Sequence, residues 1–282
     1  MKLSDIKNIQ KINSSIILAK IIDTKGSVPR EKNVFMVISS ENQFGTIGGG
    51  EFEFRVTKES LKLLKIKDKY NDTFQYSLGP SLGQCCGGYI KVKLIKFDNG
   101  LKLLEKFDLK NEIINQNQNL YIFGAGHVSN ALTNKLDGVG FNIFVIDSRE
   151  EYLKKIKYQY ANKVLAKNPE IIIQNSPSES YFIVLTHSHK LDFDICSNIL
   201  KKNNFNFFGL IGSQTKKIKF RKRLKDSGFK ENLINKMECP IGIDSIDGKE
   251  PDVIAISIIA RLLEVKTLII KKEERQLKLV KA

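Results

Sequence analysis

One short stretch limits the folds open to this chain more than any other. An apolar run at 120–123 leads into Gly124-Ala125-Gly126, then into a helical pattern, and then into a second apolar run at 141–146 that ends in Asp147. This is the pattern of a dinucleotide-binding βαβ unit, in which a strand is followed by a Gly-x-Gly turn, a helix, a second strand and an acidic residue about 20 positions on. The stretch therefore predicts a Rossmann-like, doubly wound parallel sheet.

The chain keeps alternating beyond this unit. Short apolar runs at 163–165, 181–185 and 207–211 predict three further strands. In a doubly wound sheet, ligands bind beyond the carboxyl ends of the strands, where the strand order reverses. The turns after the first and fourth strands flank that reversal, so we expect His127 and His187 to face one crevice.

The same crevice collects the candidate residues for binding a nucleotide or a phosphate. Gly124 and Gly126 would let a phosphate approach the backbone, and Asp147 stands where such units bond a ribose. Gly212 and Ser213 precede another predicted helix, whose first N–H groups favour an anion. We therefore expect all five residues to take part in cofactor binding.

The first part of the chain has a different pattern. Apolar and β-branched runs predict strands at 15–22, 33–39, 74–77 and 89–95, and apolar residues at helical spacing predict a helix at 54–64. Strands that outnumber helices in this way are typical of a small α+β unit.

These patterns together predict an α/β protein of two domains. A smaller α+β domain at 1–97 precedes the Rossmann-like doubly wound domain at 119–282, and the polar, Asn- and Gln-rich stretch at 98–118 is the expected linker. A length of 282 residues is enough for two separate cores.

Three consecutive glycines, Gly48, Gly49 and Gly50, precede the helix of the smaller domain. A glycine turn before a helix presents free N–H groups and the positive end of the helix dipole, so it is a second candidate cradle for an anion. Glu51 and Glu53 follow in the first turn, where they complement the dipole; they are equally well explained as ordinary helix-start residues.

The segment 78–88 contains four glycines, a proline and the run Gln84-Cys85-Cys86, so it predicts neither a stable helix nor the interior of a strand. Thiolates are soft metal ligands and good nucleophiles, and neighbouring backbone donors favour their charged form. Two interpretations follow: a loop that holds a metal or an anionic group with Cys85 or Cys86, or a tight turn whose cysteines are small buried residues.

The chain carries 46 Lys and Arg against 31 Asp and Glu, a formal charge of +15. Most of the excess is spread along the chain, but the predicted helix at 214–227 is unusually basic. This helix is either a solvated face or a docking surface for an acidic partner. A DNA-recognition helix of a basic nucleic-acid-binding protein is a further alternative, but the sequence lacks helix-turn-helix framing, so we expect no nucleic-acid partner.

No run approaches the ~20 apolar residues that a membrane span needs, and the first residues lack an apolar signal core. We therefore expect a cytoplasmic protein without a membrane partner. The four cysteines do not have the spacing of a disulfide framework, which favours reduced thiols.

Several motifs, taken together and in order, span roughly residues 16–263. In the first domain they are Gly26-Ser27-Val28-Pro29-Arg30, Gly45-Thr46-Ile47-Gly48-Gly49-Gly50-Glu51 and Gln84-Cys85-Cys86-Gly87-Gly88. In the second they are Phe123-Gly124-Ala125-Gly126-His127, Thr186-His187-Ser188-His189-Lys190-Leu191-Asp192, Gly209-Leu210-Ile211-Gly212-Ser213 and Cys239-Pro240-Ile241-Gly242. The chain resembles the xanthine dehydrogenase accessory proteins. Glu51 stands where the related carbon monoxide dehydrogenase branch usually has Cys.

This resemblance implies a chaperone, not an enzyme, that binds the molybdenum cofactor. Such proteins protect the cofactor while a cysteine desulfurase replaces an oxo ligand by sulfur, and then deliver it to apo-xanthine dehydrogenase or a related molybdenum hydroxylase. A homodimer is also implied.

The resemblance places Cys85 or Cys86 near the molybdenum, with Gln84 and Gly48–Gly50 as donors. It leaves Gly124, Gly126, His127 and Ser213 to hold the phosphate or nucleotide end. The main alternative is an oxidoreductase that uses NAD(P), with His187 as a proton donor.

Overall fold

The computed structural model describes residues 1–78 and 88–280. The chain divides into two compact units, Met1–Asn115 and Gln116–Ala282. The division falls at the end of helix α4 (Leu109–Gln116), within the stretch 98–118.

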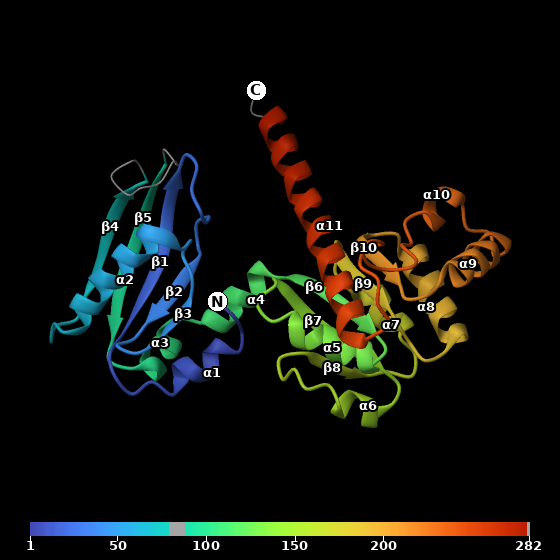
Figure 1. The fold of residues 1–282 in the computed structure, drawn as a ribbon, viewed down its shortest axis with the longest axis horizontal. Helices are drawn as coiled ribbons and strands as arrows, with labels where there is room; N and C mark the ends of the chain where they lie inside the picture. Colours follow the sequence, from blue (N-terminus) through green and yellow to red (C-terminus); the bar gives the residue numbers. More distant parts are fainter. Residues whose placement is uncertain (79–87, 281–282) are drawn as a thin grey trace. The chain divides into compact units, whose positions relative to one another are not determined.

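The N-terminal unit is built on an antiparallel sheet. In its described part five strands lie in the order β3-β2-β1-β5-β4 (Figure 1). Their bounds are β1 Ile16–Lys25, β2 Phe35–Ile38, β3 Gln43–Gly45, β4 Asn71–Ser77 and β5 Tyr89–Phe97. The short strand β3 was not predicted, because Gln43-Phe44-Gly45 has no apolar run; it forms by pairing with β2.

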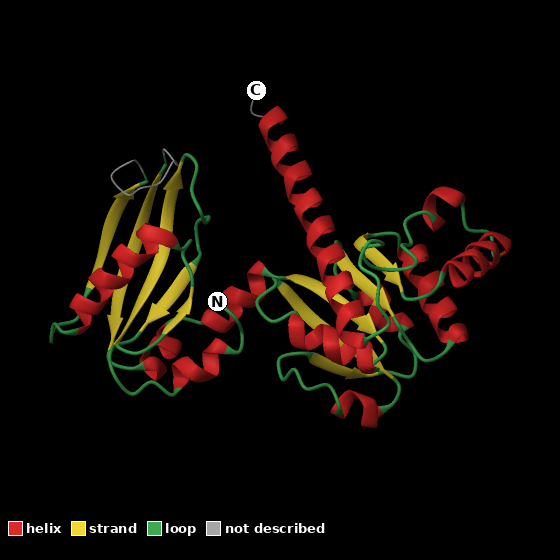
Figure 2. Ribbon diagram, in the orientation of Figure 1, coloured by secondary structure: helices red, strands yellow, loops and turns green. Residues whose placement is uncertain are grey.

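Helix α2 (Gly50–Leu64) lies across one face of this sheet (Figure 2). Its buried residues Phe52, Val56 and Leu63 recur at helical spacing and pack against the side chains of β1, β2 and β5. Residues 98–116, predicted as part of a linker, contain helix α3 (Gly100–Lys106) and the whole of α4. Glu112 of α4 pairs with Lys20 of β1 at 2.8 Å, so this polar stretch is attached to the sheet.

Helix α1 (Asp5–Gln10) packs against α3 within the same unit. Gly100, the first residue of α3, explains how close they come: a Cβ there would lie inside the backbone of Ile9. The N–H of Gly100 donates to the carbonyl of Ile12 at 2.9 Å. The first helix of the unit is thus held against the start of α3.

The C-terminal unit is built on a parallel sheet. Five strands of its described part lie in the order β10-β9-β6-β7-β8. Their bounds are β6 Gln118–Phe123, β7 Phe141–Asp147, β8 Asn162–Leu165, β9 Ser180–Val184 and β10 Phe205–Leu210. The order reverses between β6 and β9, as in a doubly wound sheet. The predicted fold class, a Rossmann-like domain preceded by a smaller α+β domain, is confirmed.

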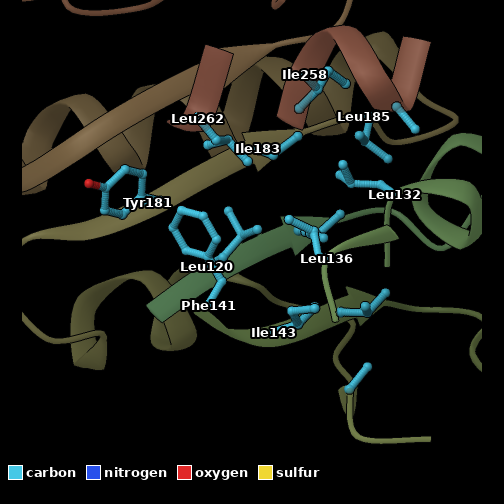
Figure 3. Close-up of a cluster of buried hydrophobic side chains, with 14 of the residues drawn as sticks. Leu120, Leu132, Leu136, Phe141, Ile143, Tyr181, Ile183, Leu185, Ile258 and Leu262 are labelled. Carbon is cyan, nitrogen blue, oxygen red and sulfur yellow. The ribbon is translucent and has the colours of Figure 1, made fainter. Parts of the chain in front are cut away.

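Helices cover both faces of this sheet. The first face carries α5 (His127–Lys135), α6 (Glu150–Lys154) and α11 (Pro251–Val280); Figure 3 shows Leu132, Leu136, Ile258 and Leu262 packed over Leu120, Ile143 and Ile183. The second face carries α7 (Glu170–Asn175), α8 (His189–Lys202), α9 (Gln214–Asp226) and α10 (Glu231–Ile234). Among the described residues, no helix is both long and apolar enough to cross a membrane.

Candidate functional site

The three glycines before α2 adopt a backbone that only glycine takes readily. Gly48, Gly49 and Gly50 have φ angles of +135°, +71° and +65°. A Cβ at Gly48 would lie 2.7 Å from Cγ of Pro29, whereas a Cβ at Gly49 would meet nothing within 4 Å. The positive φ angles therefore favour glycine at all three positions. At Gly48 the close contact with Pro29 also excludes a larger residue.

A carboxylate of the chain itself occupies part of this turn. Oε2 of Glu53 accepts hydrogen bonds from the Thr46 hydroxyl at 2.5 Å, the Ile47 N–H at 2.9 Å and the Gly49 N–H at 3.1 Å. Oε1 accepts a further bond from Gln43 at 2.8 Å. Burial raises the pKa of the Glu53 carboxyl, but these bonds outweigh burial and leave the pKa below its ordinary value.

The role of Glu53 therefore differs from that of an ordinary helix-start residue. It acts as an internal anion that satisfies the donors of the glycine turn. An external anion that used the same donors would have to displace it. The prediction that Gly48–Gly50 bind a cofactor stays a prediction, and the N–H groups of Ile47 and Gly49 are already engaged.

Leu78 and Gly88, the described residues on either side of the cysteine-bearing segment, are hydrogen-bonded to each other. Gln84, Cys85 and Cys86 lie outside the described residues, but the Leu78 N–H donates to the Gly88 carbonyl at 2.7 Å. A Cβ at Gly88 would lie 2.5 Å from the carbonyl oxygen of Ser27. Gly88 thus lies against the Gly26–Arg30 motif, which in turn packs on Gly48 through Pro29.

The Gly-x-Gly turn of the C-terminal unit joins β6 to α5. Gly124 has φ +109°, and a Cβ there would lie 2.4 Å from the carbonyl oxygen of Leu185. Gly126 is the N-cap of α5, with φ −78°, and a Cβ there would meet nothing within 4 Å. The hydroxyl of Ser129, which lies three residues after Gly126, donates to the Gly124 carbonyl and so helps to hold the turn.

Asp147 also binds within its own unit. Its buried carboxylate accepts hydrogen bonds from the Ala125 N–H at 2.8 Å and from the Arg149 side chain at 2.8 and 2.9 Å. Burial raises the pKa of Asp147, but the Arg149 and Ala125 bonds outweigh it and lower the pKa below its ordinary value. Arg149 also stacks on the ring of Tyr152 at 3.8 Å. A ribose at Asp147 would have to compete with Arg149.

The crevice at the reversal of strand order is narrow. A cavity of about 10 Å³, lined among others by Gly124, Asp147, Thr186 and His187, lies there. This is the room of about one water molecule. The structure thus brings His187 together with Gly124 and Asp147, whereas His127 is exposed at the start of α5 and does not line this cavity.

Two residues that sequence analysis did not single out organise the neighbouring turns. The buried carboxylate of Asp192 accepts bonds from the Thr186 hydroxyl at 2.7 Å and from Nζ of Lys216 at 2.7 Å. Lys216 also donates to the Ile211 carbonyl, and a Cβ at Gly212 would lie 2.6 Å from its side chain. The Ser213 hydroxyl caps α9 by accepting from the Lys216 N–H at 3.3 Å.

This network explains part of two motifs by structure alone. Thr186, Asp192 and Gly212 lock the turn after β9 to the turn after β10. The only sequence signal was the presence of Asp192 at the end of the motif that begins at Thr186. The pairing with Lys216 depends on the tertiary fold.

Metal-ligating residues are sparse in the part of the chain that the structure describes. No group of three or more His, Cys, Asp or Glu side chains is placed to hold a metal ion there. Cys196 and Cys239 are buried and free, and burial raises the pKa of both thiols. The predicted molybdenum ligands, Cys85 and Cys86, lie in the segment that is not described.

Comparison with known proteins matches both units to one family. A family described as "XdhC Rossmann domain" matches residues 120–262, and one described as "XdhC and CoxI family" matches residues 11–76. The chain belongs to the XdhC family. This membership points to an accessory role related to xanthine dehydrogenase.

Two curated relatives of this XdhC-family chain are similar in sequence. The uncharacterized protein YqeB of Escherichia coli is 25% identical over 266 residues, which are 93% of this chain and 46% of YqeB. A probable xanthine dehydrogenase subunit from Bacillus subtilis is 27% identical over 150 residues, which are 52% of this chain and 42% of that protein. The chain thus spans about half the length, or less, of both.

A solved structure shares the fold. A chain described as a xanthine dehydrogenase from Bacillus halodurans superposes with a TM-score of 0.66 at 20% identity, covering 94% of this chain and 95% of that one. At this identity the likeness concerns the fold alone.

Proposed function

We propose that this XdhC-family chain binds the molybdenum cofactor, holds it while it is sulfurated, and passes it to apo-xanthine dehydrogenase or a related molybdenum hydroxylase. In this proposal a cysteine desulfurase supplies the sulfur, and the chain acts as a homodimer in the cytoplasm. The role of an accessory factor follows from the family; the cofactor, its handling and the partners are our proposal.

One observation carries the proposal beyond family membership. Three motifs adjoin in the N-terminal unit: Gly88, which follows the segment that bears Cys85 and Cys86, lies against Ser27 of the Gly26–Arg30 motif, and Pro29 of that motif packs on Gly48 in the turn at 48–50. Backbones held this closely can present N–H donors beside thiols, which suits an anionic group that contains a metal. When bound, the molybdenum would supply the site that carries the oxo and sulfido ligands.

Some N–H groups of the glycine turn already have acceptors, which limits the residues that could bind the cofactor. The N–H groups of Ile47 and Gly49 already donate to Glu53. We therefore propose that Gln84, the thiols and the Gly50 N–H are the groups left to meet the cofactor in the N-terminal unit. In the C-terminal unit, Gly126 and His127 at the open start of α5, together with Ser213, are the proposed phosphate donors.

The proposal is tested on anaerobically purified full-length protein. We expect pterin fluorescence after oxidative release, together with molybdenum, in similar molar amounts. Cys85→Ala/Cys86→Ala should retain several-fold less of both, whereas Ser81→Ala in the same segment should retain as much as the unaltered chain. Full retention by the double variant would mean that the thiols do not hold the cofactor.

The alternative function is an oxidoreductase that uses NAD(P). The Rossmann-like sheet favours it, but the pairing of Asp147 with Arg149 and the small cavity at the crevice do not. It predicts quenching of NADH or NADPH fluorescence on binding, and turnover with a substrate. Tight binding of either nucleotide, without copurifying pterin, would favour this alternative.

A further inference from the structure

A large hollow in the described part of the C-terminal unit lies away from the crevice described above. It is a groove of about 870 Å³ between helix α9 and the edge strand β10, closed on the far side by the segment 238–244. We call it the α9–β10 groove. Neither the Gly-x-Gly turn nor His187 lines it.

The strand in the groove is a sheet edge that the chain covers only in part. The Glu238 N–H donates to the Phe208 carbonyl at 2.9 Å, and the Leu210 N–H donates to the Glu238 carbonyl at 2.8 Å. In the described chain, this segment accompanies only the end of β10. Phe205, Asn206 and Phe207 line the groove without a neighbouring strand on that side.

Helix α9 brings far more positive charge than the fold uses. It contains seven Lys and Arg residues and a single acidic one, Asp226. Three cations have partners within the unit: Lys216 binds Asp192, Arg221 binds Glu231 and Asn235, and Arg223 stacks on Phe193 at 3.7 Å.

The other four cations of α9 have no such role in the described part of the chain. No side-chain hydrogen bond or ion pair is found there for Lys217, Lys219, Lys222 or Lys225. Spacings of three and four residues bring these lysines close to one another and to Arg221, which destabilises a helix. Lys217 also lies in the first turn, beside the positive end of the helix dipole, and it lines the groove.

An exposed apolar side chain lies among these charges. Ile218 is 67% exposed on the outward side of α9, one turn from Lys222 and two turns from Lys225. Packing on the sheet is supplied by Phe220 and Leu224, so Ile218 contributes no core contact. An apolar residue ringed by cations is a feature of surfaces that bind acidic segments with apolar anchors.

We propose that the α9–β10 groove, with the outward face of α9, docks an acidic, extended segment of a partner protein. The uncovered edge of β10 offers backbone pairing, the lysines offer charge complementarity, and Ile218 offers an apolar contact. Glu238 and Asp244 also line the groove, and the carboxylate of Glu238 is paired with Arg261 at 2.8 Å. This inference does not depend on the proposed cofactor function.

The test uses the full chain and a fluorescein-labelled peptide of alternating residues, Glu-Val-Glu-Ile-Glu-Val-Glu, in fluorescence anisotropy at about 100 mM salt. Lys217→Glu/Lys222→Glu/Lys225→Glu should raise the Kd by about tenfold or more, as expected for three rim charges. Lys217→Gln/Lys222→Gln/Lys225→Gln should raise it less, and Ile218→Ser by about threefold.

The matched control places the same charge change elsewhere. Lys58→Glu/Lys65→Glu/Lys67→Glu replaces three exposed lysines in or just after α2, so both triple variants change the net charge from +15 to +9. The control should alter the Kd by less than about threefold. Equal losses in the two triple variants would reduce the effect to overall charge and overturn the proposal. Tighter binding of an oligothymidylate of equal charge, lost in the groove variant, would overturn it in favour of nucleic acid.

Discussion

The two glycine turns of this protein look alike in sequence but differ in what they leave open. In the N-terminal unit, Glu53 accepts bonds from Thr46, Ile47 and Gly49, so three donors of the turn are used internally. In the C-terminal unit, Asp147 accepts from the Ala125 N–H alone among the donors of its turn, and the space over Gly126 is empty to 4 Å.

This difference shows that a glycine-rich turn before a helix is not by itself an anion site. Both turns present N–H groups, and in both a carboxylate of the same chain takes some of them. What matters is how many donors remain after the fold has satisfied its own. By this measure the start of α5 is the more open cradle, and the turn before α2 is chiefly a structural support for the motifs around it.

The largest expected effect is that of Gly124→Ala. A Cβ there meets the backbone carbonyl of Leu185 at 2.4 Å and must adopt a positive φ, so we expect a loss of about 3–5 kcal/mol in the free energy of unfolding. Gly126→Ala is the matched control, because its φ of −78° suits any residue and its Cβ meets nothing. Urea unfolding should place it within about 0.5 kcal/mol of the unaltered chain. Similar losses in both would contradict the open space at Gly126.

Asp147→Ala should have the next largest effect. It leaves the Ala125 N–H without its acceptor and removes the carboxylate that pairs with Arg149, which is itself only partly exposed. We expect a loss of about 2–3 kcal/mol in the free energy of unfolding, with less for Asp147→Asn. If Asp147→Ala unfolds at the same urea concentration as the unaltered chain, the carboxylate is not a support of the turn and is free for a ligand.

Glu53→Gln should cost less, about 1 kcal/mol near neutral pH, because the Glu53 side chain is partly solvated. The pKa of Glu53 is lowered in the folded chain, so its stabilising contribution is complete above about 4.5, its ordinary value, and is lost as the pH falls through the folded pKa. Thermal unfolding at pH 7 and pH 3 should therefore show a gap between variant and unaltered chain that shrinks at pH 3. A gap that stays constant would show that the charge of Glu53 is not what binds the turn.

The smallest effect concerns ligand binding by the bare turns. In a titration with inorganic phosphate followed by NMR, the backbone amide signals of Gly126 and His127 should shift, while those of Ile47 and Gly49 should not. In Glu53→Gln, which offers a weaker acceptor, the Ile47 and Gly49 signals should begin to respond. Shifts of Ile47 and Gly49 in the unaltered chain would remove the distinction between the two turns.

Local patterns predicted most of the elements. Alternating or apolar runs located β1, β5, β7 and β9 to within a few residues, and the Gly-x-Gly pattern located α5. The strand β3 was missed because it has no apolar run and forms by pairing with β2. The helices α3 and α4 were missed because they lie in the stretch 98–118, which was predicted as a linker from its polar, Asn- and Gln-rich composition. Periodicity indicates which side of an element is buried, and a short segment buries too few residues to give a clear pattern.

The residues of the candidate site could be predicted from the sequence, but their hydrogen-bond and ion-pair partners could not. Glycines stand out because positive φ angles require them, so Gly48, Gly49 and Gly124 could be selected from the sequence. The carboxylates that accept hydrogen bonds from these turns could not be selected in this way, because Glu53 was interpreted as a helix-start residue and Asp147 as a ribose ligand. The pairing of Lys216 with Asp192 joins residues 24 positions apart, and nothing local signals it.

The sequence alone thus determined the family, the two-part architecture and the places where the backbone must turn tightly, because these depend on residue type and short-range spacing. The tertiary structure decided which donors are already used, which cations of α9 have partners, and that Gly88 lies against Ser27. Those outcomes depend on distances between segments far apart in the chain, and a hydrogen bond or an ion pair forms only where folding brings its two partners within about 3–4 Å.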